Sequence, residues 1–303
     1  MTDPTPDFMK SNPPEPSFVS VHGGHSGEFC LHAKDRLEDM IKRYIELGFT
    51  WVGITEHLPA WKDEFMYPDE IAANLTPKKM LKTFDSYIKE CNRLKQKYDS
   101  KIRIFTAFEI ETCSGYDAFV PEMIKRFKPD YIVGSVHHVN DLGFDISRSQ
   151  YLETAEKSGG MDALYERYFD LQYEMLMTIN PAVAGHFDLI RLFDVDYGLR
   201  IKKPCIWQKI VRNLECIRRQ DIVMDYNLRA LTKGAEEPYI SAPILKLAGE
   251  MGIRVVPGED SHSVADIGKN MERGIKTLDD LGFTTSFEPP RLYSWEKQET
   301  HNK

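Results

Sequence analysis

Histidines gather at the ends of short apolar runs in this chain. Seven of its nine histidines stand at such ends, together with one glutamate and one aspartate. Histidine nitrogens and carboxylate oxygens are common protein ligands for divalent cations. If the runs are parallel strands, their carboxyl ends meet on one face and these side chains converge. We therefore predict a metal site there, with the candidate ligands His22, His25, His32, His57, Glu109, His137, His186, Asp260 and His262.

The first apolar run, FVSVHGGH at residues 18–25, ends in two histidines separated by two glycines. Glycine permits unusual backbone angles and a close approach of the chain to a metal ion. The same pattern also fits two exposed loop histidines. His32 follows in the same loop, and Cys30 beside it is a lesser candidate for a thiolate ligand.

Spacing within two other runs separates ligands from supporting residues. Glu109 and Glu111 are two residues apart, so both point to the same side of a regular strand. An inward carboxylate needs a metal or a cation to offset its desolvation, and Glu111 is the better candidate for a rim position. The adjacent His137 and His138 face opposite ways, so we predict that only His137 is a ligand.

Carboxylates accompany histidines at two later strand ends. In GEDSH, Asp260 and His262 share a face, which is a moderately specific pattern for a metal site. In AGHFD, His186 and Asp188 also share a face. Asp188 could orient a histidine without binding the metal itself.

The elements that must position these residues alternate between strand-like and helix-like patterns. Such alternation predicts a parallel sheet with right-handed crossovers. An open sheet would place its ligands at one switch point, whereas these come from nearly every strand, so a closed barrel is predicted. The expected strands are 18–25, 51–57, 102–111, 131–138, 182–188, 222–227 and 253–262, and the expected helices 35–48, 76–98, 116–127, 161–179, 204–220, 241–252 and 264–282.

Two connections, residues 58–75 and 139–160, are long. Long loops that follow strands on the active face of a barrel usually shape a substrate pocket. We therefore expect these two loops to contact the substrate. Residues 1–17, rich in proline, are predicted to be a disordered arm, residues 18–285 a catalytic barrel, and residues 286–303 a surface tail.

Composition limits the classes of function. With 303 residues, 42% hydrophobic and 28% charged, the chain fits a soluble globular protein. A net charge of -8 argues against nucleic-acid binding but permits an anionic substrate at a metal cluster. The five cysteines form no CxxC pair, and no signal peptide or apolar membrane span is recognisable. We therefore expect a cytoplasmic protein with reduced thiols and no membrane partner.

Seven motifs, in this order, resemble one known family over roughly residues 18–285. They are HGGHSGEFCLHA, GITEH, FEIE, GSVHHV, GHFDLI, MDYN and GEDSH. The chain resembles the polymerase-and-histidinol-phosphatase (PHP) family, most closely its monofunctional histidinol-phosphatases. This resemblance implies an α/β fold, a distorted (β/α)7 barrel with a tri-metal site at the carboxyl ends of the strands. That fold agrees with the independent count of strands.

The resemblance also implies which residues hold each metal. The three groups are His22, His25, Glu109 and Asp260; Glu109, His137 and His186; and His32, His57 and His262. One departure concerns the first strand, where the family usually has H-x-H and this chain has H-G-G-H. Either His22 reaches the site through a one-residue bulge, or Gly23 fills the first position and one metal lacks a ligand. The two glycines favour the bulge.

The implied activity is hydrolysis of L-histidinol phosphate to L-histidinol and phosphate, a step of histidine biosynthesis. Two to three divalent ions would bind the phosphoryl oxygens, and a metal-bridging hydroxide would attack phosphorus in line. Zinc, iron and manganese all suit such ligands. Glu109, Asp260 and His262 are the expected catalytic residues, and a homo-oligomer is possible.

Substrate-binding candidates lie beside the metal motifs. Arginine suits bidentate contact with phosphate, although each candidate cation also fits an exposed surface. Asn227, at the end of the sixth strand, fits a hydrogen bond to the substrate. The ammonium group of histidinol requires an acid, and Asp145 or Glu111 could supply it. The candidate phosphate contacts are Arg191, Arg229 and Lys233.

Two other functions remain open from the sequence. One is another phosphomonoesterase or a nuclease of the same family. A nuclease needs basic, aromatic-lined flanks, and the acidic balance of the chain argues against it. The other is a degenerate metal-dependent binding module. The nearly complete ligand set argues against degeneration, and only the H-G-G-H departure favours it.

Overall fold

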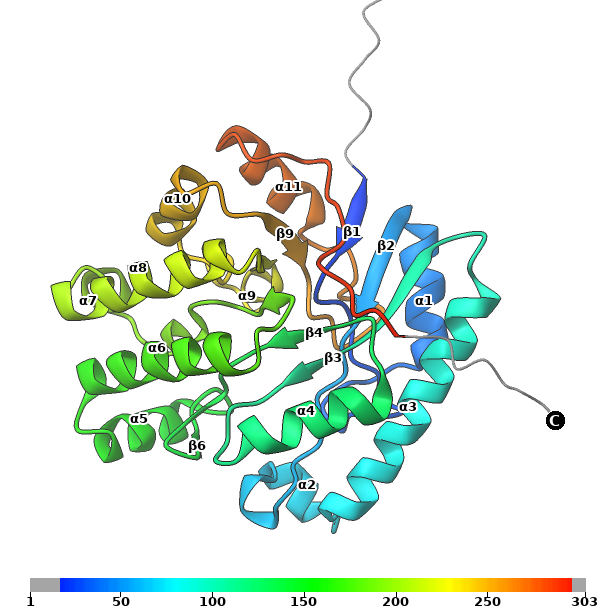
Figure 1. Ribbon diagram of the computed structural model, residues 1–303, viewed down its shortest axis with the longest axis horizontal. Helices are drawn as coiled ribbons and strands as arrows, with labels where there is room; N and C mark the ends of the chain where they lie inside the picture. Colours follow the sequence, from blue (N-terminus) through cyan, green and yellow to red (C-terminus); the bar gives the residue numbers. More distant parts are fainter. Residues whose placement is uncertain (1–16, 296–303) are drawn as a thin grey trace, which may run out of the picture.

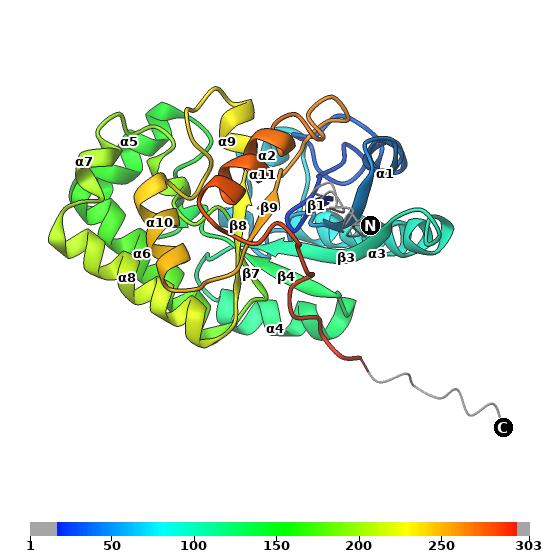
Figure 2. The ribbon, with the colours of Figure 1, turned by 90° about the horizontal axis from the view of Figure 1, so that it is seen from above.

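A computed structural model describes residues 17–295 of the chain, so the predicted arm at 1–17 falls almost wholly outside the described residues. Seven parallel strands form one sheet in the order β1-β2-β3-β4-β7-β8-β9. Helices lie outside this sheet in both views (Figures 1 and 2). The strands are β1 (Phe18–Ser20), β2 (Phe49–Ile54), β3 (Arg103–Ile110), β4 (Tyr131–Gly134), β7 (Val183–Ala184), β8 (Val223–Asn227) and β9 (Val255–Gly258).

Backbone hydrogen bonds bring the first and last strands together. The Val21 amide donates to the Pro257 carbonyl at 2.9 Å, and the Glu259 amide donates to the His22 carbonyl at 2.9 Å. The sheet is therefore a nearly closed barrel, which confirms the predicted (β/α)7 architecture. Closure matters for function because it places the carboxyl ends of all seven strands around one centre.

One glycine allows a side chain to cross the barrel interior. The Tyr131 hydroxyl donates to the Val21 carbonyl at 2.6 Å, from one side of the barrel to the other. A Cβ atom at Gly53 would lie 1.5 Å from that hydroxyl oxygen, so no other residue fits there. The interior beneath the site is thus filled and fixed by packing.

Within residues 17–295, six of the predicted helices connect consecutive strands and a seventh, α11, follows β9, as the periodicity predicts. Helix α3, for example, begins where the Thr76 side chain accepts the Lys79 amide at 3.3 Å, with Pro77 as the first helical residue. Each helix buries one face against the sheet or a neighbouring helix. The seven are α1 (Leu37–Glu46), α3 (Pro77–Lys97), α4 (Tyr116–Phe127), α6 (Met161–Thr178), α8 (Pro204–Arg219), α10 (Ala242–Glu250) and α11 (Met271–Asp280).

The two long loops contain regular structure that the sequence analysis did not predict. Residues 58–75 include η1 (Asp63–Phe65) and α2 (Pro68–Ala72). A hairpin of β5 (His138–Val139) and β6 (Leu142–Gly143) opens the second loop, one residue before its predicted start, and α5 (Arg148–Lys157) lies within residues 139–160. Helix α5 escaped prediction because few of its residues are apolar. Three further short helices are η2 (Leu189–Arg191), α7 (Tyr197–Arg200) and α9 (Arg229–Thr232).

Residues 283–295, the C-terminal strap, run along the amino ends of the strands. The Trp51 indole donates to the Phe287 carbonyl at 3.0 Å, the Tyr293 amide to the Asp130 carbonyl at 2.7 Å, and the Trp295 indole to the Pro129 carbonyl at 2.7 Å. The strap thus holds the first part of the segment predicted as a surface tail against the barrel. Residues 296–303 of that segment lie outside the described part of the chain.

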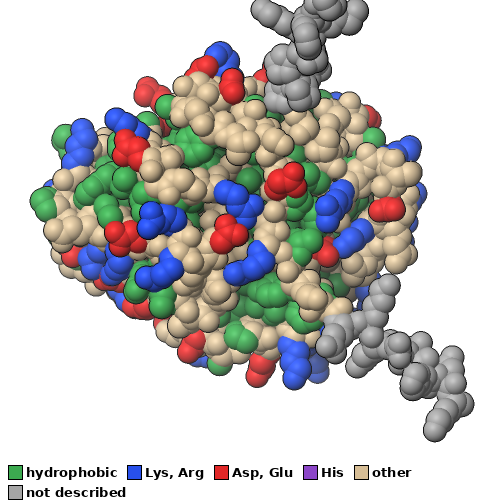
Figure 3. Space-filling model, turned by 45° about the horizontal axis from the view of Figure 1, so that its top comes forward, with side chains coloured by type: hydrophobic (Ala, Val, Ile, Leu, Met, Phe, Trp, Pro, Cys, Tyr) green, Lys and Arg blue, Asp and Glu red, His purple; other side chains and the backbone are tan. Residues whose placement is uncertain are grey.

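The surface charges, the cysteines and the helix lengths bear on the expectations from composition. Cationic and anionic side chains are interspersed on the face shown in Figure 3, which displays no extended patch of one sign. All five cysteines are free. Within residues 17–295, no helix combines the length and apolar character that a membrane span requires.

Candidate metal centre

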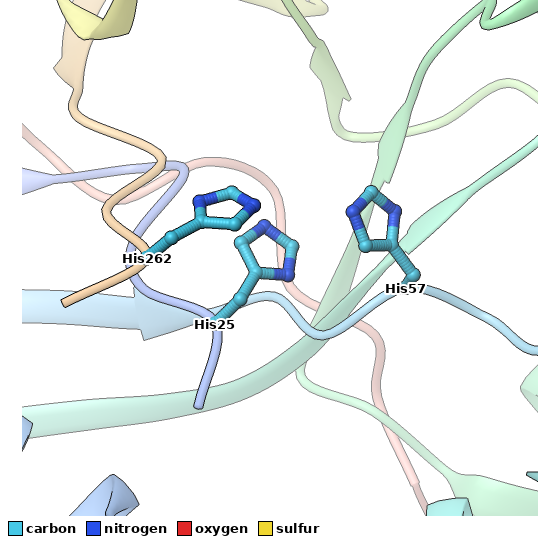
Figure 4. A group of neighbouring side chains, drawn as sticks. All are labelled: His25, His57 and His262. Atoms are coloured by element: carbon cyan, nitrogen blue, oxygen red, sulfur yellow. The ribbon is translucent and has the colours of Figure 1, made fainter. Parts of the chain in front are cut away.

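The structure brings all nine predicted metal ligands to the carboxyl ends of the strands. The rings of His25 and His57 lie 4.4 Å apart between centroids, and those of His25 and His262 lie 4.6 Å apart. Figure 4 shows these three rings side by side, although they follow β1, β2 and β9. His32 also approaches, with its ring centroid 4.8 Å from that of His262.

Glu109, near the end of β3, lies at the middle of this group. Its Oε1 atom is 2.8 Å from His186 Nε2 and 3.3 Å from His137 Nε2. Its Oε2 atom is 3.1 Å from His57 Nδ1 and 3.5 Å from His22 Nε2. The side chain is 1% exposed, and its ion-pair partners among the described residues are these four histidines alone. A buried carboxylate without lysine or arginine is suited to bridge two cations.

In the H-G-G-H motif, the structure turns the His22 ring toward the other candidate ligands. A Cβ atom at Gly23 would lie 2.3 Å from the Gly53 carbonyl oxygen, so no side chain fits at that position. The His22 ring is fully buried, and its Nδ1 lies 2.8 Å from Asp225 Oδ2. The other ring nitrogen, Nε2, therefore faces Glu109 and is free to bind a metal.

Asp260 adds a carboxylate to the His25 side of the centre. Its Oδ1 atom lies 3.2 Å from His25 Nε2, and its backbone carbonyl lies 2.9 Å from His262 Nδ1. Its backbone has a φ angle of 47°, in the left-handed region that aspartate tolerates better than most residues. Here the amide of Asp260 donates to the His22 carbonyl at 2.9 Å.

Several buried ring nitrogens at this centre have no hydrogen-bond partner. They include Nε2 of His22, both ring nitrogens of His25, and Nδ1 of His57. Three of these nitrogens face carboxylates without forming a hydrogen bond: His22 Nε2 and His57 Nδ1 face Glu109 at 3.5 and 3.1 Å, and His25 Nε2 faces Asp260 at 3.2 Å. A cation bound by nitrogen and carboxylate together would satisfy both groups. Five groups in the described part of the chain have ligand atoms within 4.8 Å of one another. Three consist of predicted ligands: His22, His25 and Glu109; Glu109, His137 and His186; and His25, His57 and His262. The other two contain Glu111: His57, Glu111 and His137; and Glu111, Cys113 and His138. The donor set therefore fits divalent metals.

The third of these groups differs from the one that the resemblance implies. It contains His25 in place of His32. His32 is exposed, and both of its ring nitrogens lie about 3.1–3.2 Å from Cys30 Sγ. His32 thus lies at the edge of the centre, beside the one cysteine that the sequence analysis considered as a ligand.

Opposite charges at the centre stabilise one another. Burial alone would raise the pKa of Glu109, but His22, His137 and His57 outweigh it and hold that pKa well below the usual range. Burial would likewise lower the pKa of His22, but Glu109 and Asp225 outweigh it and raise that pKa well above normal. For His57, burial and the neighbouring His25 lower the pKa. A neutral imidazole is the form that binds a metal.

Two buried carboxylates at the centre were not predicted. Asp225, on β8, contacts His22 Nδ1 and accepts the His186 amide at 3.2 Å. Glu56 accepts the Ser26 amide at 2.6 Å, and its Oε2 atom lies 3.6 Å from His25 Nδ1. Carboxylates behind metal-binding histidines fix the ring orientation. The available signal was an acidic residue inside or directly after an apolar run, in MDYN and ITEH.

Three predicted substrate residues line one cavity above the centre, which we call the metal-side cavity. Its volume is about 410 Å³, and Arg229, Lys233 and Asp145 all border it. The Arg229 guanidinium is held in place because Nη1 donates to the Asp260 carbonyl at 2.7 Å. Positive side chains beside a metal centre are suited to bind an anionic group.

Three other predicted substrate residues do not border the metal-side cavity. Arg191 is buried, and its guanidinium donates to the Glu237 carbonyl at 3.0 Å and pairs with Asp188 at 3.3 Å. Asn227 is also buried, and its amide donates to Asp225 at 3.0 Å. Glu111 accepts the Tyr67 hydroxyl at 2.8 Å and lies 3.1 Å from His138 Nδ1. These contacts use the polar atoms that the sequence analysis assigned to the substrate.

Comparison with known proteins identifies the family. The PHP domain model matches residues 23–229. A "Probable histidinol-phosphatase" of Schizosaccharomyces pombe is 34% identical over 271 residues, 88% of each chain, and the histidinol-phosphatase of Saccharomyces cerevisiae is 29% identical over 297 residues, 86% of this chain and 88% of the yeast protein.

Solved structures agree in fold. A Listeria monocytogenes protein assigned as a histidinol phosphatase superposes with a TM-score of 0.73 at 25% identity, over 84% of this chain and 99% of that one. A Lactococcus lactis histidinol phosphate phosphatase, determined with zinc, L-histidinol and phosphate, gives a TM-score of 0.66 at 16% identity, over 88% of this chain and 94% of that one. With the fold, the domain match and the curated relatives in agreement, this chain belongs to the PHP family.

Proposed function

We propose that this protein is a metal-dependent phosphomonoesterase that hydrolyses L-histidinol phosphate to L-histidinol and phosphate. One observation carries the proposal: the buried Glu109 carboxylate faces four imidazoles beneath a cavity bordered by Arg229 and Lys233. The substrate follows from the named relatives, of which the Schizosaccharomyces pombe protein is 34% identical. The free cysteines suit a reducing compartment, so we propose a cytoplasmic enzyme.

Glu109 is the residue we propose to be shared between two metal ions. Bound divalent ions would neutralise charge on the phosphoryl oxygens and lower the pKa of a coordinated water. Zinc, iron and manganese all suit histidine and carboxylate donors. The ligands we propose are His22, His25, Glu109 and Asp260 for one ion, Glu109, His137 and His186 for a second, and His57 and His262 with His25 or His32 for a third.

Side chains on the cavity wall would hold the two ends of the substrate. Arg229 and Lys233 would contact the phosphoryl group, and Arg229 is already oriented by the Asp260 carbonyl. Asp145 would accept the ammonium group of the substrate, because its Oδ1 atom is buried without a partner and the residue borders the same cavity. Glu111 is less available because Tyr67 and His138 occupy its carboxylate.

Metal analysis and a substrate comparison test the proposal. The purified protein should contain two to three divalent ions per chain, and a chelator should abolish phosphate release. The kcat/KM for L-histidinol phosphate should exceed that for phenyl phosphate by at least about tenfold, because a buried charge-assisted hydrogen bond contributes roughly 1.5–3 kcal/mol. Equal values for the two substrates would instead identify a general phosphoesterase.

A further inference from the structure

A second cavity, of about 200 Å³, adjoins the metal-side cavity. The two cavities share His32, His57 and Tyr67 in their walls. The second one extends from these residues beneath the loop 58–75, toward the first turns of α3. None of the functions assigned above uses it. Because of its lining, we call it the aromatic cavity.

The walls of the aromatic cavity are rigid and apolar. Trp61 stacks on Phe119, with ring centroids 4.7 Å apart and planes at 27°, and meets the edge of Phe65 at 5.1 Å. Phe84, on α3, packs against Tyr87 at 5.2 Å. Trp61, Phe65 and Phe84 border the cavity while these contacts hold them in place. A preformed aromatic wall favours a flat ring over a flexible chain.

The charge of the lining differs between the two cavities. The aromatic cavity is bordered by Glu28, Glu56, Glu70 and Glu111, and by no lysine or arginine. The metal-side cavity is also bordered by four carboxylates, but Arg229 and Lys233 border it too, and the four carboxylates are those of Asp69, Glu109, Asp145 and Asp260. The aromatic cavity therefore disfavours phosphate and favours a ring that donates hydrogen bonds or carries positive charge.

Glu70 is the carboxylate in this lining that lacks a cation. Glu28 pairs with Arg36 at 3.4 Å, Glu56 lies 3.6 Å from His25, and Glu111 lies 3.6 Å from His137. Glu70 Oε2 accepts the Tyr67 amide at 2.8 Å, and the carboxylate forms no ion pair within the described residues. Burial, with help from Glu111, raises the pKa of Glu70 to about 7, as expected for a carboxylate without a counter-ion.

We propose that the aromatic cavity binds the imidazole ring of the substrate, with Glu70 accepting a hydrogen bond from a ring N–H. This proposal rests on the proposed function and adds the residues that select the leaving group. His32, His57 and Tyr67 border both cavities, so the two cavities are neighbours. A substrate with its phosphoryl group on the metal side would therefore have its ring close to the aromatic side. A short carbon chain joins these two groups in histidinol phosphate.

Two substitutions test the proposal without touching the metal ligands. Glu70→Gln removes the charge, and Thr83→Trp fills the cavity from α3, where Thr83 borders it. Each should lower kcat/KM for L-histidinol phosphate by about tenfold or more. Neither should change kcat/KM for phosphoethanolamine, which carries an ammonium group but no ring. Glu64→Gln, on an exposed glutamate of η1 outside this lining, is the matched control and should change neither value.

A second measurement separates the substrate ring from a free ligand. L-histidinol should inhibit the wild-type enzyme competitively against histidinol phosphate, and Thr83→Trp should raise its Ki by about tenfold. Noncompetitive inhibition that Thr83→Trp removes would overturn the proposal and assign the cavity to a separate ligand.

Failure of the ring site and failure of the proposed function give different results. If the wild-type enzyme prefers histidinol phosphate and both variants keep that preference, the ring lies elsewhere and the proposed function stands. If both variants slow all substrates equally and lose metal, the cavity supports the metal centre and the ring site is excluded. If the wild-type enzyme shows no preference, the proposed function itself fails.

Discussion

The two ends of the barrel differ in how their buried polar groups are satisfied. At the carboxyl ends of the strands, buried ring nitrogens of His22, His25 and His57 have no hydrogen-bond partner. At the amino ends, the strap satisfies its polar groups, as when Trp51 and Trp295 donate to backbone carbonyls. The unpartnered atoms at the carboxyl end are metal-binding nitrogens gathered in one place, and a bound cation would supply their partners. One end of the barrel is therefore suited to bind ligands, whereas the contacts of the strap at the other end maintain the fold.

The largest expected effect is on turnover and comes from a substitution of Glu109, at the carboxyl end of the barrel. Glu109→Gln keeps the size of the side chain but removes the charge that faces four imidazoles. We predict that kcat falls by at least about 10³-fold, because electrostatic stabilisation at the reacting group is lost. Thermal unfolding monitored by circular dichroism should show a folded protein. Near-normal turnover with full metal content would mean that Glu111 is the important carboxylate.

The amino end should show the opposite pattern. Phe287 in the strap is 7% exposed, and Phe287→Ala should lower the free energy of unfolding by about 3 kcal/mol, because a large buried ring is lost. The kcat/KM for histidinol phosphate should not change at a temperature where the variant is folded. Leu292→Ala in the same strap, at a residue 37% exposed, is the control and should cost less than about 0.5 kcal/mol. Denaturant titration measures both. A large loss of activity in Phe287→Ala would break the division between the two ends.

The sequence was informative where one residue type repeated at one structural position. Apolar runs that end in histidine predicted the strands, the barrel and the convergence of the candidate ligands. Side-chain partners were harder to predict because they depend on three-dimensional neighbours. Arg191 pairs with Asp188, a residue three positions earlier, and its guanidinium is turned away from the cavity. Helix α5 was missed because its stability comes from packing of Tyr151 and Ala155 and not from a regular apolar pattern.

At the carboxyl end, Asp225 differs from the predicted metal ligands because it contacts one of them from behind. It orients His22 through Nδ1 at 2.8 Å but does not face the metal side of that ring. Asp225→Asn should weaken metal affinity by about 10–100-fold, the usual effect of removing a carboxylate behind a metal-binding histidine. Competition with a chelator measures this without relying on turnover. Asp221→Asn, at an exposed aspartate before β8 that pairs with Arg254, should leave affinity unchanged. Equal affinities in all three proteins would exclude this role for Asp225.

Asp145 gives the smallest effect, because it should influence which ester is chosen and not how fast phosphate leaves. Its unpartnered Oδ1 atom borders the metal-side cavity, whereas Glu111 is bound by Tyr67 and by His138. Asp145→Asn should therefore reduce the ratio of kcat/KM between histidinol phosphate and phenyl phosphate by about tenfold, the lower end for a charge-assisted hydrogen bond.

Glu111→Gln tests whether Asp145 or Glu111 binds the ammonium group of the substrate. Glu111 lies 3.6 Å from His137 Nδ1, so its loss should mainly slow both esters through the metal ligand. Because Glu111 also borders the aromatic cavity, the ratio should fall, but by less than in Asp145→Asn. Asp117→Asn, at an exposed position on α4, should change neither quantity. If Glu111→Gln shifts the ratio and Asp145→Asn does not, the ammonium group is bound behind His137. Glu111 would then both select the substrate and support a metal ligand, whereas we expect Asp145 to bind the ammonium group and Glu111 to support His137.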